Sequence, residues 1–80
     1  MDSPEQREMA RQVGAALRAA RKRHGIYTQV TASEAVGRSS EYVSRAENGT
    51  FNMSVWALLQ LAHLYDVTPS ALLEGIQLPE

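Results

Sequence analysis

Four of the five glycines in the sequence, at positions 25, 37, 49 and 75, each follow a stretch whose apolar residues recur at helical spacing. Glycine adopts the left-handed backbone that ends a helix without the steric penalty of a Cβ atom. The glycines therefore divide the chain into short helices, and no alternation of apolar and polar residues predicts a strand. We expect an all-α fold, a compact domain of five helices.

Length and composition limit the possibilities further. The 80 residues suffice for a single domain over residues 1–80, with a modest core over about residues 9–74 and a frayed tail over residues 75–80. The absence of cysteine excludes disulfides, a thiol nucleophile and a thiolate metal site. No apolar run approaches the roughly 20 residues of a membrane span. We therefore expect no membrane partner and a cytoplasmic location.

Local signals place the helices. Polar residues suited to a helix N-cap occur at Ser3, Thr28, Ser54 and Thr68. They predict a first helix to about residue 24, a second over about 28–36, a fourth after Ser54 and a fifth after Thr68. For the third helix, which ends at Gly49, we expect a cap at Ser39 or Ser40.

The apolar spacing predicts which side chains are buried. The stripe of the first helix comprises Met9, Val13, Leu17 and Ala20. On the fourth helix we expect burial of Val55, Leu58, Leu59, Leu61, Ala62 and Tyr65. In the fifth helix, Leu72 and Leu73 are expected to fold back onto the core.

The charge is unevenly distributed, although the net charge is only -1. Residues 11–50 carry a net charge of +4, whereas residues 1–10 and 51–80 are acidic. This basic block covers two short helices, over about residues 28–47, separated by a turn with a glycine. Such a pair is typical of the DNA-binding helix-turn-helix, whose second helix enters the major groove. Helical geometry places positions 41, 44, 45 and 48 on one side of that helix.

Several stretches carry a resemblance to a known family. They are Thr28-Gln29, the turn over residues 35–39, the segment Tyr-Val-Ser-Arg-Ala-Glu-Asn-Gly over residues 42–49, and the helix after Ser54. Over about residues 13–73 the chain resembles the Cro and lambda-repressor type (XRE) helix-turn-helix family. The resemblance implies a five-helix, lambda-repressor-like domain that binds double-stranded DNA, in a prokaryotic, phage or plasmid context.

The resemblance also implies roles for individual residues. The base-reading positions are Ser40, Glu41, Ser44 and Arg45. The positions expected at the DNA backbone are Gln29, Arg38, Ser39 and Asn48. Arg21 and Glu47 match a structural ion pair that ties the first helix to the end of the third.

The chain departs from the family pattern at two places. Tyr27 is an extra residue before the second helix, so we expect the entry to that helix to be displaced. Ala32-Ser33 replaces the usual Leu-Ala pair, which places a hydroxyl near the core.

Three side chains have alternative interpretations. Glu41 can read a base or serve as an acid at the N-terminus of the third helix, where the helix dipole favours negative charge. Arg45 can read a base, contact a phosphate or pair with Glu41. Trp56 lies opposite the core side of its helix and indicates either an interface or a shallow packing site.

The resulting expectation is a sequence-specific transcriptional regulator of repressor or controller type, acting as a homodimer. The candidate dimer interface comprises Trp56, Gln60 and His63. The alternative is a protein-interaction module, such as an antitoxin or adaptor, with the same fold. No catalytic constellation appears, and His24 and His63 lack further ligands, so we expect no enzyme, metal, cofactor or small-molecule effector.

Overall fold

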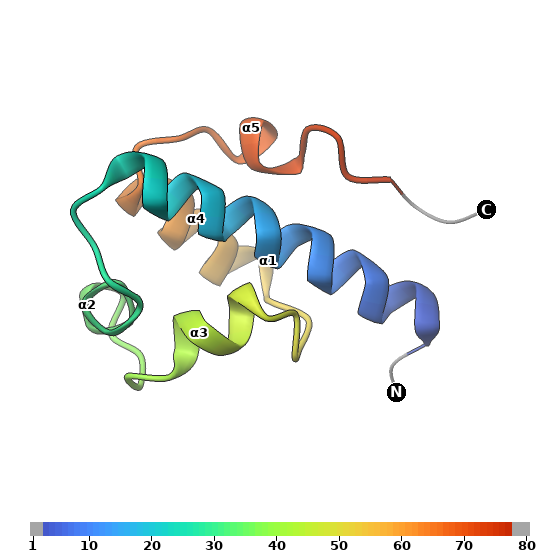
Figure 1. Ribbon diagram of the computed structural model, residues 1–80, viewed down its shortest axis with the longest axis horizontal. Coiled ribbons are helices and arrows are strands. Elements are labelled where there is room, and N and C mark those ends of the chain that lie inside the picture. Colours follow the sequence, from blue (N-terminus) through green and yellow to red (C-terminus); the bar gives the residue numbers. More distant parts are fainter. Residues whose placement is uncertain (1–2, 78–80) are drawn as a thin grey trace.

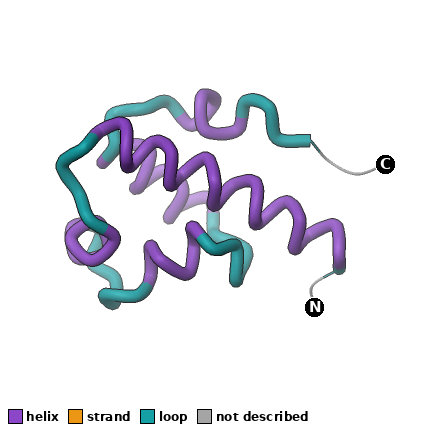
Figure 2. Tube along the Cα trace, viewed as in Figure 1, coloured by secondary structure: helices purple, strands orange, loops and turns teal. Residues whose placement is uncertain are grey.

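Helix α1 (Pro4–His24) is the longest element, and the other helices pack around it (Figure 1). The computed structural model describes residues 3–77, which form α1, α2 (Gln29–Ala35), α3 (Tyr42–Glu47), α4 (Val55–Leu64) and α5 (Pro69–Leu73). Helices and loops account for all of these residues, without a strand (Figure 2). The all-α, five-helix prediction is confirmed. None of the helices within residues 3–77 has the length and apolarity needed to cross a membrane.

Side-chain caps start four of the five helices, as predicted. Ser3, Thr28, Ser54 and Thr68 each accept a hydrogen bond from the backbone N–H three residues later. Such caps satisfy donors that the first turn of a helix leaves free. The four glycines predicted to end helical segments all have positive φ, between 69° and 84°.

The predicted cap of α3 is wrong. Neither Ser39 nor Ser40 caps this helix; Glu41 occupies the N-cap position and makes no side-chain capping bond. The Ser39 carbonyl instead accepts a hydrogen bond from the Tyr42 N–H at 3.0 Å, which closes a tight turn ahead of the helix. This turn delays the start of α3 to Tyr42.

The core lies between α1 and the other helices and contains Leu17, Val43, Leu61, Tyr65 and Leu72. Three residues expected there are exposed instead, namely Val55, Leu59 and Leu73. The buried side of α4 is formed by Ala57, Leu61 and Ala62, with Leu58 half-buried. Because successive helical residues turn by about 100°, Val55 and Leu59 point away from that side. No further layer of the described chain covers them.

Despite the extra Tyr27, α2 begins where the capping signal predicts. Thr28 caps α2 through a capping box with Thr31, and α2 begins at Gln29. The Tyr27 ring stacks on His24 at a centroid distance of 5.5 Å and lies 6.4 Å from the ring of Tyr65. The extra residue therefore closes one end of the core with its side chain.

Residues 75–77, expected to fray, are instead tied to α1. The Gln12 side chain accepts a hydrogen bond from the Gln77 N–H at 3.0 Å and donates one to the Gln77 carbonyl at 3.2 Å. The remainder of the expected frayed tail, residues 78–80, lies outside the described residues.

A close contact joins the middle of α1 to the end of α3. A Cβ atom at Gly14 would clash with the carbonyl oxygen of Ala46 and would lie 2.5 Å from that of Glu47. A side chain of any size at position 14 would therefore force the two helices apart. This glycine sets the distance between α1 and α3.

We predict that Gly14→Ala destabilises the protein. Alanine favours an isolated helix by about 1 kcal/mol over glycine, but overpacking a core costs about 1–3 kcal/mol. We expect the clash to dominate, because the opposing atoms are backbone. Urea unfolding measures the change. Ala15→Gly, at an exposed position of α1, gives the helix-propensity contribution alone. An increase in stability for Gly14→Ala would contradict the prediction.

Candidate nucleic-acid interface

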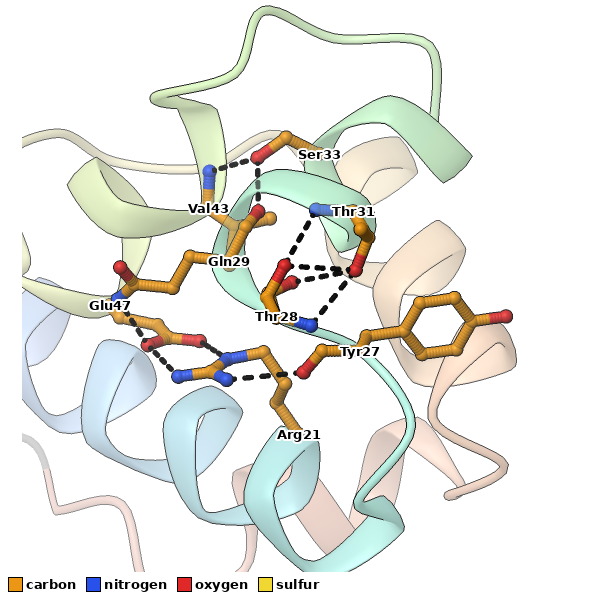
Figure 3. Close-up of polar contacts among 8 residues, drawn as sticks. All are labelled: Arg21, Tyr27, Thr28, Gln29, Thr31, Ser33, Val43 and Glu47. Atoms are coloured by element: carbon orange, nitrogen blue, oxygen red, sulfur yellow. Dashed lines mark hydrogen bonds and ion pairs between the residues drawn. The ribbon is translucent and has the colours of Figure 1, made fainter.

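A buried serine joins α2 to the start of α3 (Figure 3). The Ser33 hydroxyl is fully buried, donates to the Gln29 carbonyl at 2.8 Å and accepts from the Val43 N–H at 3.0 Å. Val43 lies in the first turn of α3, where an N–H has no partner within its own helix. Ser33 therefore provides from α2 the capping bond that Ser39 and Ser40 do not provide.

A buried ion pair holds the other end of α3 (Figure 3). The Arg21 guanidinium of α1 donates to both oxygens of Glu47, through Nε at 2.7 Å and Nη2 at 3.1 Å. The Glu47 side chain is completely buried and that of Arg21 is 11% exposed. The Gln29 amide of α2 donates to the same carboxylate at 2.9 Å, and Arg21 also donates to the Tyr27 carbonyl. Three helices thus meet at one carboxylate.

The pKa values of Arg21 and of the adjacent Tyr65 are both raised. The hydrogen bond to Glu47 raises the pKa of Arg21 above its ordinary value, against the opposing effect of burial. Burial raises the pKa of Tyr65 to about 12, and the nearby charge of Glu47 adds to this shift while Arg21 opposes it. At neutral pH the Arg21 guanidinium is therefore protonated, and the phenol of Tyr65 is neutral.

The outer face of α3 is polar and accessible. Glu41, Arg45 and Asn48 are exposed, Ser44 is half-buried, and Ser39 and Ser40 are exposed in the preceding turn. The two ion pairs of residues 3–77 are Arg11–Glu8 and Arg21–Glu47, so Arg45 does not pair with Glu41. The intrahelical pairing considered for Arg45 is therefore absent, and its guanidinium is free of ion pairs within residues 3–77.

The structure also shows what surrounds the other residues expected at the DNA backbone. The Arg38 guanidinium lies over the Tyr42 ring at 4.9 Å, and this ring contacts Phe51. Gln29 is half-buried and engaged with Glu47. After α3, Thr50 donates from both its N–H and its hydroxyl to the Arg45 carbonyl, which fixes the end of the helix.

Helix α4 exposes an apolar and aromatic surface. Val55 is 72% exposed, Trp56 66% and Leu59 41%. His63 is also exposed, and Gln60 is half-buried, with a side-chain carbonyl oxygen that has no hydrogen-bond partner among the described residues. Beside this surface, Val55 and Leu58 border an apolar cavity of about 170 Å³ that reaches Met9 and Phe51.

Two residues that position α3 were not assigned this role from the sequence. Gly14 is the one glycine that does not follow a helical stretch, and a lone glycine within an alanine-rich helix is a recognisable signal of close helix packing. For Ser33, the sequence indicates a hydroxyl near the core, and a buried hydroxyl requires a hydrogen-bond partner. The partner, Val43, lies on another helix, and only the folded structure identifies it.

Comparisons with known proteins agree with this geometry. A family profile for a helix-turn-helix domain matches residues 12–74. Among solved structures, the chain is similar to the clp gene regulator ClgR from C. glutamicum, with 29% identity and a TM-score of 0.75, over 81% of this chain and 83% of that chain. It is also similar to the restriction-modification controller protein C.AhdI from Aeromonas hydrophila, with 28% identity and a TM-score of 0.76, over 88% and 99% of the two chains. No protein with a curated description matches significantly.

We predict that Glu47→Gln lowers the free energy of unfolding by about 3 kcal/mol, because it leaves a largely buried guanidinium without its counter-charge. Glu8→Gln is the matched control, since it breaks the exposed pair with Arg11, which should contribute less than about 1 kcal/mol. Urea unfolding of both variants measures the difference. Equal losses for the two variants would show that the buried pair does not hold α3.

Proposed function

The chain belongs to the helix-turn-helix domain family, and from this premise we propose that it is a sequence-specific transcriptional regulator that reads the DNA major groove with α3. The observation that carries the proposal is the free Arg45 guanidinium on the exposed face of a helix whose two ends are fixed from α1 and α2. Base reading requires this combination, because hydrogen bonds to base edges depend on precise placement of the side chain.

We assign base reading to Ser40, Glu41, Ser44 and Arg45. The planar fork of Arg45 matches the O6 and N7 acceptors of guanine, and Glu41 can accept from the amino group of cytosine. The serine hydroxyls can donate or accept at either type of base pair.

Contacts to the DNA backbone are assigned to Gln29, Arg38, Ser39 and Asn48. Backbone contacts set the register and orientation of a protein on the duplex. The bond from Gln29 to Glu47 uses one of the two amide hydrogens, and the second remains for a phosphate oxygen. Arg38 is exposed although its guanidinium lies over the Tyr42 ring, so it remains accessible to a phosphate.

We further propose that the regulator is a cytoplasmic homodimer that contacts its partner through Trp56, Gln60 and His63 on α4. A two-fold dimer doubles the number of bases read and places the half-sites about one helical turn apart. The exposed Trp56, flanked by Val55 and Leu59, supports this interface because aromatic anchors dominate binding energy. The similarity to a gene regulator and to a controller protein favours regulation of repressor or controller type.

The same α4 surface supports a second candidate, a protein-interaction module such as an antitoxin or adaptor. Under this alternative, Trp56 and its neighbours bind a different protein, and the face of α3 is not used for DNA. The two functions differ in whether the purified chain selects a DNA sequence.

Selection from a randomised duplex pool tests the proposal. We predict that the wild type enriches one sequence, and that Arg45→Ala loses about 1–3 kcal/mol of discrimination at the base pair it reads. Arg23→Ala, an exposed arginine on α1, is the control and should keep the preference. Absence of enrichment for the wild type would refute DNA reading and favour the interaction module.

For the dimer, we predict that Trp56→Glu raises the dissociation constant at least about 30-fold, since a buried aromatic anchor contributes about 2 kcal/mol or more. Sedimentation velocity over a concentration series measures the constant. Ile26→Glu is the matched control, because Ile26 is 73% exposed and lies outside α4. If the wild type is monomeric throughout, or if both variants weaken it equally, the proposed interface is wrong.

A further inference from the structure

Helix α1 carries four exposed basic residues on one side, which we call the basic stripe: Arg7, Arg11, Arg18 and Lys22. At about 100° per residue, these positions fall within a sector of about 60°. Arg11 forms an exposed ion pair with Glu8, and the other three make no ion pair within residues 3–77. Such an exposed pair contributes little and can exchange partners readily.

The basic stripe borders α3. A Cβ atom at Gly49, which ends α3, would lie 2.7 Å from the Cα atom of Arg11, so α1 and the end of α3 are in contact there. Gly14, which packs against the end of α3, lies within about 20° of Arg7 around the helix axis. Arg23 lies about 130° around the helix axis from the centre of the stripe and faces α5, beside Ala71 and Glu74. The stripe is therefore adjacent to the helix assigned to base reading, on the side away from α5.

The stripe lacks the apolar side chains of a protein-docking surface. The exposed large hydrophobic residues of the described chain all lie outside α1. Protein interfaces are built around an apolar or aromatic core, whereas contact with a phosphate backbone needs mainly cations. The basic stripe is therefore suited to bind a polyanion rather than an apolar protein surface.

We propose that the basic stripe binds the phosphate backbone of DNA beside the bases read by α3, an inference that rests on the proposed function. From Arg7 to Lys22 the stripe extends about 22 Å at 1.5 Å per residue, which is longer than α3 itself. The stripe would therefore extend the DNA-binding surface of the protein. It would not add sequence specificity, because contacts to the DNA backbone carry no base information. Glu8 competes with the phosphates for Arg11.

Fluorescence anisotropy of the full chain on two duplexes tests the inference. One duplex is the sequence selected by the wild type with long flanks, and the other is a mixed sequence of the same length. Each is titrated at several salt concentrations. The variants are Arg18→Gln, the triple variant Arg7→Gln, Arg11→Gln and Arg18→Gln, and Glu8→Gln. The control is Arg23→Gln, which removes the same charge from the side of α1 that faces α5.

The binding constant falls as salt rises, and we expect this dependence to become shallower in the variants. The magnitude of the slope of log K against log salt should decrease by about 0.9 for each phosphate that is no longer neutralised, roughly 3 for the triple variant. The preference for the selected over the mixed duplex should not change, and Glu8→Gln should raise the affinity for both. Trimming the flanks of the selected duplex should weaken the wild type more than the triple variant.

Two results overturn the inference in distinguishable ways. If Arg18→Gln and the triple variant have the same salt slope as Arg23→Gln while Arg45→Ala still loses sequence preference, the stripe does not contact DNA and the proposed function stands. If the wild type binds neither duplex, the inference falls together with the proposed function. Circular dichroism of each variant verifies that it is folded.

Discussion

The arrangement of the first three helices depends on the buried carboxylate of Glu47. It is completely buried at the last residue of α3, and it receives hydrogen bonds from Arg21 of α1 and Gln29 of α2. A buried charge that loses its partner costs several kcal/mol, a large part of the stability of a small domain. The three helices therefore cannot shift independently, because any shift would break bonds to this group.

This constraint matters because α3 could not persist alone. It comprises Tyr42–Glu47, much shorter than the roughly 12–15 residues at which isolated helices become marginally stable. Its N-terminal end depends on Ser33, its C-terminal end on Arg21 and Thr50, and its distance from α1 on Gly14. These bonds all engage the inner side and the ends of α3, so the polar residues on its outer face are positioned by the backbone and accessible to a partner.

The parts of the fold that follow from neighbouring residues could be predicted from the sequence. The caps at Ser3 and Thr28 and the glycine ends of helices depend on groups within a few residues, and all were confirmed. The prediction of the α3 cap was wrong because the capping acceptor, the Ser33 hydroxyl, lies on another helix, ten residues before the Val43 N–H that it binds. The expected burial of Val55 and Leu59 was wrong because α4 is apolar on nearly all sides, so its sequence does not show which side faces the core.

In the candidate site too, the features set by local spacing could be predicted from the sequence, whereas contacts between distant residues could not. Helical spacing is sufficient to place Glu41 and Arg45 on one face, and both are exposed. The bond from Gln29 to Glu47 joins residues 18 positions apart and has no local signal. The extra Tyr27 could be recognised from the sequence, but its accommodation required the facing rings of His24 and Tyr65.

The distribution of charge explains how a chain with a net charge of -1 can have a face suited to DNA. Screening in salt limits exposed charges to a range of about 10 Å, so a polyanion responds to the nearest face rather than to the total. The acidic residues Asp66 and Glu74 belong to the segments that follow α4 and α5, whereas Arg18 and Arg45 are exposed on α1 and α3. The packing that buries Glu47 buries its partner Arg21 with it, so the pair does not change the balance of charge around α3. Glu8 and Glu41 are exposed among the basic residues of α1 and α3, but they are outnumbered by Arg7, Arg11, Arg18, Lys22 and Arg45. The face around α3 is therefore more positive than the net charge of the chain indicates.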